Sequence, residues 1–148
     1  MPREHGHIKL EADELAKFAA EQTRCIVATL DPDGAPWGDA AACVFHGGRL
    51  YFRVRTSTRT FRNVQNDNRV CCTIESHPAG APYYTIKGAL LHGRASAEAN
   101  PPTELIAALD QLPDPVTGAA ATDGAVFSVG TDDVASFDFA KIRRRFDQ

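Results

Sequence analysis

The sequence predicts a mainly β protein of the α+β class, built as an antiparallel β-barrel of six or seven strands with helices packed outside. Short apolar or alternating segments recur along the chain, with turn residues between them. Gly88 and Gly93 interrupt the longest segment, as bends do in the wall of a barrel. The 148 residues are enough for one compact domain.

One helix and three strands form the first half of the predicted barrel. They are a helix over Glu11–Gln22 and strands over Arg24–Leu30, Ala35–Phe45 and Arg49–Arg55. The helix has apolar residues at helical spacing on one face, so we expect it to cover the sheet. Residues 31–34 are a strong turn signal between the first two strands. The third strand alternates, which places Arg53 and Arg55 on the face opposite Leu50.

Four further strands and two helices complete the predicted barrel. They are a short helix capped by Ser57 or Thr58 and reaching about Asn66, strands over Arg69–Ser76 and Tyr83–Ala97, a helix over Thr103–Leu112, and closing strands over Ala125–Val129 and Val134–Phe139. Phe61 and Val64 stand three residues apart in the short helix and are expected to face the core. Pro, Gly and Ala dominate residues 113–124, which predicts a loop.

The composition is that of an ordinary globular protein, with 43% apolar and 24% charged residues, and it excludes disorder of the whole chain. No apolar run approaches the roughly 18 to 20 residues that cross a bilayer. The first ten residues lack a signal-like apolar segment. We therefore expect a cytoplasmic single domain over residues 1–148, with a flexible segment 1–10, a tail over 141–148 and no membrane partner.

The four cysteines lie in apolar or alternating segments, and none has the C-x-x-C spacing of a zinc or thioredoxin-type site. We therefore predict buried free thiols at Cys25, Cys43, Cys71 and Cys72. A redox role for the adjacent Cys71 and Cys72 is the alternative. His5 and His7 have no acidic or thiol partner at metal-ligand spacing, so no metal site is predicted.

Positive charge is concentrated in one segment of an acidic protein. The net charge of −3 gives no support for a nucleic-acid partner. Residues 49–69 nevertheless hold six arginines against one acid, Asp67. Two interpretations fit this segment: it binds a small anionic ligand, or its arginines cover the solvent face of a strand and a helix.

The junction of the third strand and the short helix is a candidate phosphate site. Three hydroxyl residues, Thr56, Ser57 and Thr58, precede Arg59 at the expected helix start. The free backbone donors of the first turn, the helix dipole and a guanidinium would converge there. Asn63 lies one turn later on the same helix face, and arginine can hold two phosphate oxygens at once.

Several short motifs together resemble a known family. They are Asp33-Gly34-Ala35-Pro36, Leu50-Tyr51-Phe52, Arg59 with Asn63 and Val64, Asp67-Asn68-Arg69-Val70, Lys87-Gly88-Ala89 and the segment Val134–Phe139. In order and spacing they resemble the FMN-binding split-barrel proteins of the pyridoxamine 5'-phosphate oxidase type, including their deazaflavin-using relatives. The resemblance covers roughly residues 12–140. It implies a homodimer with two flavin sites at the subunit interface.

The resemblance also implies where the flavin lies. It places the ring against Ala40, Ala41, Ala42 and Cys43, with Arg53 and Val54 at its border, and the phosphate at Thr58, Arg59 and Thr60. Tyr83 stands where a ring-binding amide is common. Arg55, Thr56 and Ser57 join the phosphate shell on physical grounds, with Asn63 beside them.

Departures from the family pattern limit the expected activity. Cys43 and Thr60 replace usual lysines, and Val54 replaces a hydroxyl residue. The Trp-Arg pair and Arg-x-His substrate motif of the vitamin-specific members are missing, and residues 141–146 are basic instead. A true pyridoxamine phosphate oxidase is therefore not expected. Residues 143–145 fit an anionic substrate, the partner subunit or simple solvent exposure.

The expected activity is hydride exchange between bound FMN and a small organic substrate. The flavin would supply the chemistry, which agrees with the lack of a catalytic triad or nucleotide-binding fingerprint in the sequence. One alternative is a deazaflavin-dependent reductase, whose anionic coenzyme would also suit the arginines. Another is a non-catalytic binder of flavin or haem, with His46, His77 and His92 as candidate axial ligands.

Overall fold

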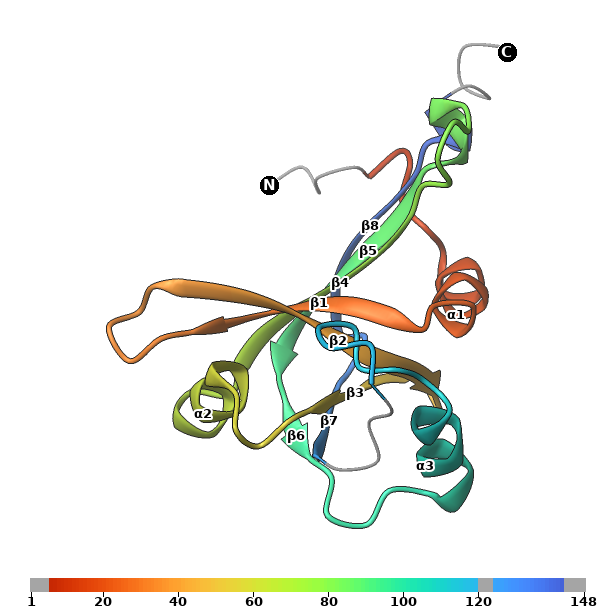
Figure 1. The fold of residues 1–148 in the computed structure, drawn as a ribbon. Coiled ribbons are helices and arrows are strands. Elements are labelled where there is room, and N and C mark those ends of the chain that lie inside the picture. The colour runs from red at the N-terminus through yellow and green to blue at the C-terminus, as the bar shows by residue number, and fades with distance from the viewer. Residues whose placement is uncertain (1–5, 120–123, 143–148) are drawn as a thin grey trace.

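A computed structural model describes residues 6–119 and 124–142. Its elements are α1 (Ala12–Ala20), β1 (Arg24–Leu30), β2 (Pro36–His46), β3 (Arg49–Val54), α2 (Arg59–Asn66), β4 (Arg69–Ser76), the 3₁₀ turn η1 (Tyr83–Thr85), β5 (Lys87–Arg94), β6 (Ser96–Ala97), α3 (Thr103–Asp110), β7 (Ala125–Val129) and β8 (Asp133–Asp138). The strands form one sheet in the order β6-β7-β3-β2-β1-β4-β5-β8, and neighbouring strands are antiparallel. Figure 1 shows this sheet curled into a half-barrel, which confirms the predicted fold class.

The prediction of one long strand over residues 83–97 is wrong, because the segment divides into η1, β5 and β6. β5 pairs with β4 and β8, whereas β6 pairs with β7. The chain therefore passes from one side of the curled sheet to the other at Ala95, which is buried and donates its N–H to Asn68 O at 2.7 Å. The two-residue β6 brings the described strands to eight instead of the predicted six or seven.

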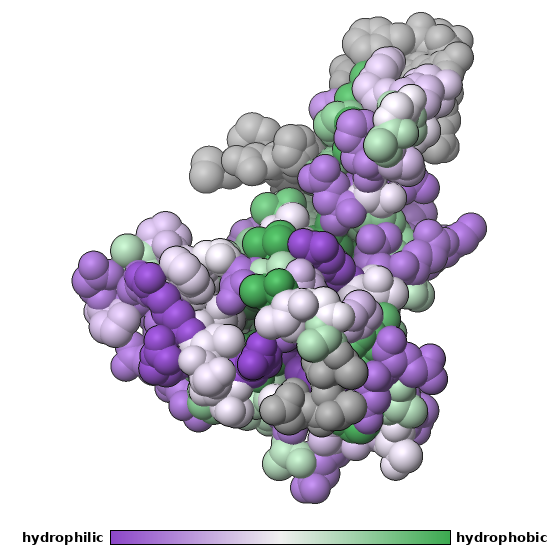
Figure 2. Space-filling view, viewed as in Figure 1, coloured by the Kyte–Doolittle hydropathy of each residue, from purple (hydrophilic) through white to green (hydrophobic). Residues whose placement is uncertain are grey.

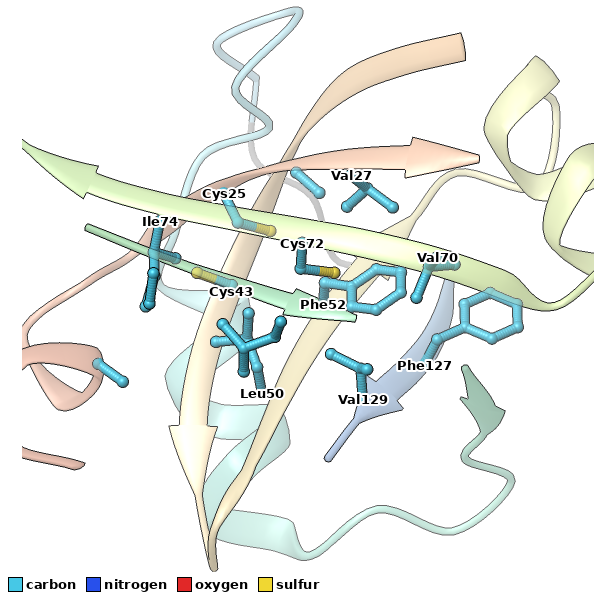
Figure 3. Packing of buried hydrophobic residues seen from close by; sticks show 14 of the residues in the cluster. Cys25, Val27, Cys43, Leu50, Phe52, Val70, Cys72, Ile74, Phe127 and Val129 are labelled. Carbon is cyan, nitrogen blue, oxygen red and sulfur yellow. The ribbon is translucent and has the colours of Figure 1, made fainter. Parts of the chain in front are cut away.

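The core lies inside the curl of the sheet. Phe52, Leu50 and Ile74 are fully buried there, and Phe52 stacks on Phe127 with ring centroids 5.9 Å apart. Figure 3 shows these side chains converging from strands on both sides of the curl. Val64 of α2 joins the core as predicted, and Phe61 packs against it.

Three of the four cysteines are core residues, as predicted. Cys25, Cys43 and Cys72 are free thiols with at most 2% exposure, and Figure 3 shows their sulfur atoms inside the core. The hydrogen bond with Cys43 lowers the pKa of Cys25, but the bond with Cys72 and burial outweigh it and raise that pKa well above its usual value. Cys71 is half-buried, and burial raises its pKa as well.

The helices lie at the periphery of the sheet (Figure 1): α3 packs on its outer face, whereas α1 and α2 pack side chains against the core inside the curl. α2 contacts β1 and β2, α3 packs on β2, and α1 lies against the far end of β2. β4, β5 and β8 continue into an arm that extends away from the body and carries η1 at its tip. The β1–β2 hairpin projects on another side, directly beside α2. The arrangement places the β3–α2 junction under the hairpin.

Both ends of the described chain contact the sheet. Asp138 N–H donates to Ile8 O at 2.8 Å, and Leu10 N–H donates to Ser136 Oγ at 2.9 Å. Ile8 and Leu10 are buried, although both fall in the segment expected to be flexible. Residues 143–145, the basic tail of the sequence analysis, lie outside the described residues. No helix in the described part of the chain is long and apolar enough to cross a membrane.

Candidate functional site

A small pocket of about 80 Å³ opens where β3 ends and α2 begins. Its lining residues include seven that the sequence predicted, namely Ala40, Ala41, Arg53, Val54, Arg55, Thr58 and Thr60. They come from β2, β3 and the first turn of α2, so the fold brings together segments that are separated in the sequence. In Figure 1 the loop that follows α3 passes in front of β2, and residues 114–116 of this loop form another wall of the pocket.

Two guanidinium groups stand on the β3 side of the pocket. The Arg53 side chain is 6% exposed, and its Nη1 lies 2.8 Å from Asp110 Oδ1 at the end of α3. Gly124 runs close to Arg53, and a Cβ there would lie 3.3 Å from Arg53 Cγ and 2.8 Å from Val54 O. The side chain of Arg55 is exposed, and among the described residues it has no ion pair. The pocket therefore has one buried and one exposed cation.

The start of α2 leaves backbone donors at the pocket. Thr58 is the N-cap: its Oγ1 accepts from Phe61 N–H at 3.2 Å and donates to Arg55 O at 2.7 Å. Thr60 Oγ1 donates to Asp39 Oδ2 at 3.1 Å. Both hydroxyl protons are thus used within the protein. The N–H groups of Arg59 and Thr60, in the first turn of the helix, donate to no other described residue, so they can serve an anion.

Two residues predicted for the phosphate lie outside the pocket lining and hold α2 to the β1–β2 hairpin. Arg59 makes a two-point ion pair with Asp31, and Asn63 Nδ2 donates to Asp31 Oδ1 at 2.9 Å and to Thr29 Oγ1 at 3.1 Å. The hydrogen bond from Arg59, followed by that from Asn63, lowers the pKa of Asp31. The same pair raises the pKa of Arg59. Trp37 lies under the guanidinium, 4.1 Å from Arg59 Cζ to the ring centroid.

The structure does not bring the remaining predicted residues into the pocket lining. Ala42 and Cys43 are buried, and Cys43 belongs to the core. Thr56 and Ser57 are exposed in the turn beside the pocket. Tyr83 is 56% exposed in η1, and Figure 1 shows the tip of the arm well away from the start of α2.

Sequence reasoning missed three parts of this site. Asp110 pairs with Arg53 from a helix 57 positions later, and no local motif predicts a contact over that separation. Asp39 of β2 orients Thr60 by accepting a hydrogen bond from its hydroxyl group, and no motif in the sequence predicts this contact. The loop wall depends on Asp114, whose carboxylate accepts from the N–H groups of Val116 and Thr117 at 2.8 and 3.2 Å. Such an Asx turn could have been inferred from the Asp-Pro sequence.

The donor set of the pocket fits an anion, but its volume fits only part of a flavin. Pockets that hold a whole small molecule measure about 300 to 1,000 Å³, against about 80 Å³ here. A phosphate-sized group could lie between the guanidinium groups and the first turn of α2. A flavin ring would then extend over the open surface of β2 and need a cover from outside the chain.

A larger hollow of about 880 Å³ lies between α1 and β8, and none of the predicted flavin-site residues lines it. Of the candidate haem ligands, His92 lines this hollow, His46 packs edge-on against Tyr51, and His77 is exposed. Within residues 6–119 and 124–142, no group of three potential ligands is placed to hold a metal ion. Volume alone therefore does not identify the candidate site. The arginine and hydroxyl side chains predicted for the flavin line the smaller pocket instead.

Comparison with known proteins agrees with the half-barrel fold. The family model described as pyridoxamine 5'-phosphate oxidase matches residues 12–120. A conserved hypothetical protein from Mycobacterium tuberculosis has a similar structure, with a TM-score of 0.74 and 19% identity over 93% of this chain and 91% of that one. No curated protein matches the chain in sequence.

Two other similar structures carry names that mention a ligand. A FAD-binding protein from Mesorhizobium loti has a TM-score of 0.68 and 16% identity over 86% of this chain and 93% of its own. A haem storage protein from Vibrio cholerae has a TM-score of 0.61 and 18% identity over 86% of this chain and 93% of its own. At these identities the likeness establishes a shared fold.

Proposed function

This chain belongs to the pyridoxamine 5'-phosphate oxidase family, and from that premise we propose that it is an FMN-dependent oxidoreductase acting on a small organic substrate. The observation that carries the proposal is the convergence of Arg53, Arg55 and the first turn of α2 on one pocket. Anions are favoured at such a place because Arg53 and Arg55 line it and the N-terminal turn of a helix lies beside it.

The residues of the pocket have distinct roles in this proposal. Arg55 and the N–H groups of Arg59 and Thr60 hold the phosphate, and the buried Arg53 supports them from the β3 side. The ring lies along β2 at Ala40 and Ala41, whose small side chains leave room for a flat group. The bound flavin would supply the hydride chemistry. The protein binds the flavin, orients it and limits the access of water to it.

We further propose that the working unit is a homodimer. The outer face of the sheet exposes Ile26, which is 45% exposed and pairs across strands with Ala40 and Thr73. Figure 2 shows hydrophobic surface near the middle of the molecule, with hydrophilic residues around it. Such a patch on a protein surface is typical of an interaction site. A second copy seated there would cover the open side of the pocket and would explain why Tyr83, on the projecting arm, lies far from the pocket of its own chain.

Purification of the protein followed by titration with FMN tests the proposal. We expect flavin absorbance in the purified protein, or saturable binding of added FMN with one site per chain. A matched titration with a deazaflavin coenzyme separates the two classes of flavin. A colourless protein that binds neither would contradict the proposal.

A non-catalytic haem-binding function is the second candidate, and the similarity to a haem storage protein is the observation in its favour. None of His46, His77 and His92 lines the small pocket. A haem function would therefore use a different part of the molecule, such as the hollow that contains His92. A Soret band on addition of haem, lost in His92→Ala, would support it.

A further inference from the structure

Arg59 is already engaged by the protein on two sides. Its Nε donates to Asp31 Oδ1 at 2.9 Å, and its Nη2 pairs with Oδ2 of the same carboxylate. The guanidinium carbon lies 4.1 Å from the centroid of the Trp37 ring. This pairing uses the forked edge with which arginine would hold two phosphate oxygens.

The acceptor of Arg59 is itself fixed in place. The Asp31 side chain is 10% exposed, and its Oδ1 also accepts from Asn63, a residue that is 2% exposed. Backbone bonds of the hairpin turn hold Asp31 as well, since its N–H donates to Ala35 O at 2.8 Å. Release of Arg59 would leave this largely buried carboxylate without its cation, which is costly.

Arg53 in β3 and Arg55 directly after it differ from Arg59 in their position relative to the pocket. Arg53 and Arg55 line the pocket, and Arg59 does not. The exposed Arg55 has no ion pair with any residue that the structure describes, so its fork is available to a ligand at no cost to the fold.

We propose that Arg59 is a positioning residue that clamps α2 to the β1–β2 hairpin through Asp31, and that Arg55, supported by Arg53, recognises the anionic group of the ligand. This inference rests on the proposed function. It reassigns the phosphate arginine that the family resemblance implies. The clamp acts indirectly, because it holds the first turn of α2, with its N–H donors, against the pocket.

The test compares FMN with riboflavin, which lacks the phosphate, by equilibrium dialysis. We expect Arg55→Ala to weaken FMN binding by about tenfold or more, the usual effect of losing a charge-assisted hydrogen bond, and to leave riboflavin binding unchanged. Arg59→Ala, which loosens the first turn of α2 and its N–H donors, should weaken FMN binding less than Arg55→Ala does, leave riboflavin binding unchanged and lower the thermal midpoint. Selective loss of FMN binding in Arg59→Ala, with none in Arg55→Ala, would overturn the assignment.

Asp31→Asn replaces the carboxylate by an amide of nearly the same size. It distinguishes an Asp31 that holds α2 in place through Arg59 from one that only competes with phosphate for Arg59. If Asp31 only competed with phosphate for Arg59, this variant would bind FMN more tightly than the wild type, and the clamp would be refuted. We expect no gain in FMN affinity and a lower thermal midpoint.

A double-mutant cycle of Asp31→Asn and Arg59→Ala on the thermal midpoint tests the clamp without any ligand. We expect the thermal midpoint of the double variant to be only slightly lower than that of either single variant. Additive losses would overturn the clamp. A wild-type protein that binds neither FMN nor inorganic phosphate would overturn the proposed function and the role of Arg55, and the cycle would still decide the role of Arg59.

Discussion

Arg53 carries its charge into the interior of the protein, with a side chain that is 6% exposed. A buried charge is tolerated when it is paired and hydrogen-bonded. Asp110 supplies a carboxylate 2.8 Å away, although that carboxylate is itself 38% exposed. The pair therefore joins the end of α3 to the pocket wall.

Removal of this carboxylate should destabilise the protein. For Asp110→Ala we expect the free energy of unfolding to fall by about 1 to 3 kcal/mol, because a buried guanidinium loses its anion. Urea denaturation measures the effect. The control is Glu104→Gln, an exposed change on the same helix, which should stay within about 0.5 kcal/mol of the wild type. Equal effects of the two substitutions would contradict a structural role for the pair.

Two carboxylates should make the stability depend on acid pH. Hydrogen bonds from Arg59 and Asn63 lower the pKa of Asp31, and hydrogen bonds from Arg69 lower the pKa of Asp67 to about 2. A lowered pKa stabilises the fold above the ordinary carboxyl pKa of about 3.9, and this stabilisation is lost as the pH falls toward the folded pKa. Asp31→Asn should therefore reduce the loss of stability between about pH 6 and pH 3. An unchanged pH dependence would argue against the ion pair.

At the scale of elements, α2 depends on its cap and on its side-chain bonds to the hairpin. Thr58 Oγ1 accepts from Phe61 N–H, one of the first-turn donors of the helix. We expect Thr58→Ala to cost about 1 kcal/mol of stability, within the usual range for loss of an N-cap. The neighbouring Ser57→Ala is the control and should have a much smaller effect on chemical denaturation. The cap assignment fails if Ser57→Ala is the more damaging change.

The arm formed by β4, β5 and β8 needs a glycine at Gly88. A Cβ at this position would lie 2.3 Å from Cζ of the Phe137 ring on the paired strand β8. Gly88→Ala should therefore cost about 1 to 3 kcal/mol, as overpacking does. Gly93→Ala in the same strand is the matched control, because its Cβ would lie 3.4 Å from Val129 Cγ2. Thermal unfolding that affects Gly93→Ala more than Gly88→Ala would contradict this packing.

Most elements could be predicted because their signals are local. β1 and β4 have the predicted bounds, and α2 begins at its predicted cap, since turn residues and a hydroxyl define those ends. The division of residues 83–97 could not be predicted, because the break at Ala95 depends on which strands pair with β5 and β6.

The location of the candidate site could be predicted from the sequence, but only some of its side-chain contacts could. The concentration of arginines and hydroxyl residues predicts a site at the β3–α2 junction, where the structure has a pocket lined by Arg53, Arg55 and Thr58. The sequence could not distinguish the arginine that faces the pocket from the one that pairs with Asp31, because Asp31 is 28 positions from Arg59 and reaches it only through the fold.

At the scale of the whole molecule, the exposed face around Ile26 should govern assembly. A charge in a hydrophobic interface is unfavourable, so we expect Ile26→Arg to convert the proposed dimer to monomer. Sedimentation velocity measures the change. Glu21→Arg, an exposed change at the end of α1, should leave the assembly intact. A wild-type protein that sediments as a monomer at all concentrations would refute the dimer.

The most direct test of the central claim is a crystal structure of the protein with FMN. The account predicts the phosphate within hydrogen-bonding distance of Arg55 and of the N–H groups of Arg59 and Thr60, with the ring on β2 and a second subunit over it. Arg59 would still be paired with Asp31. A flavin bound in the hollow between α1 and β8, or a phosphate held by the Arg59 side chain, would contradict the account.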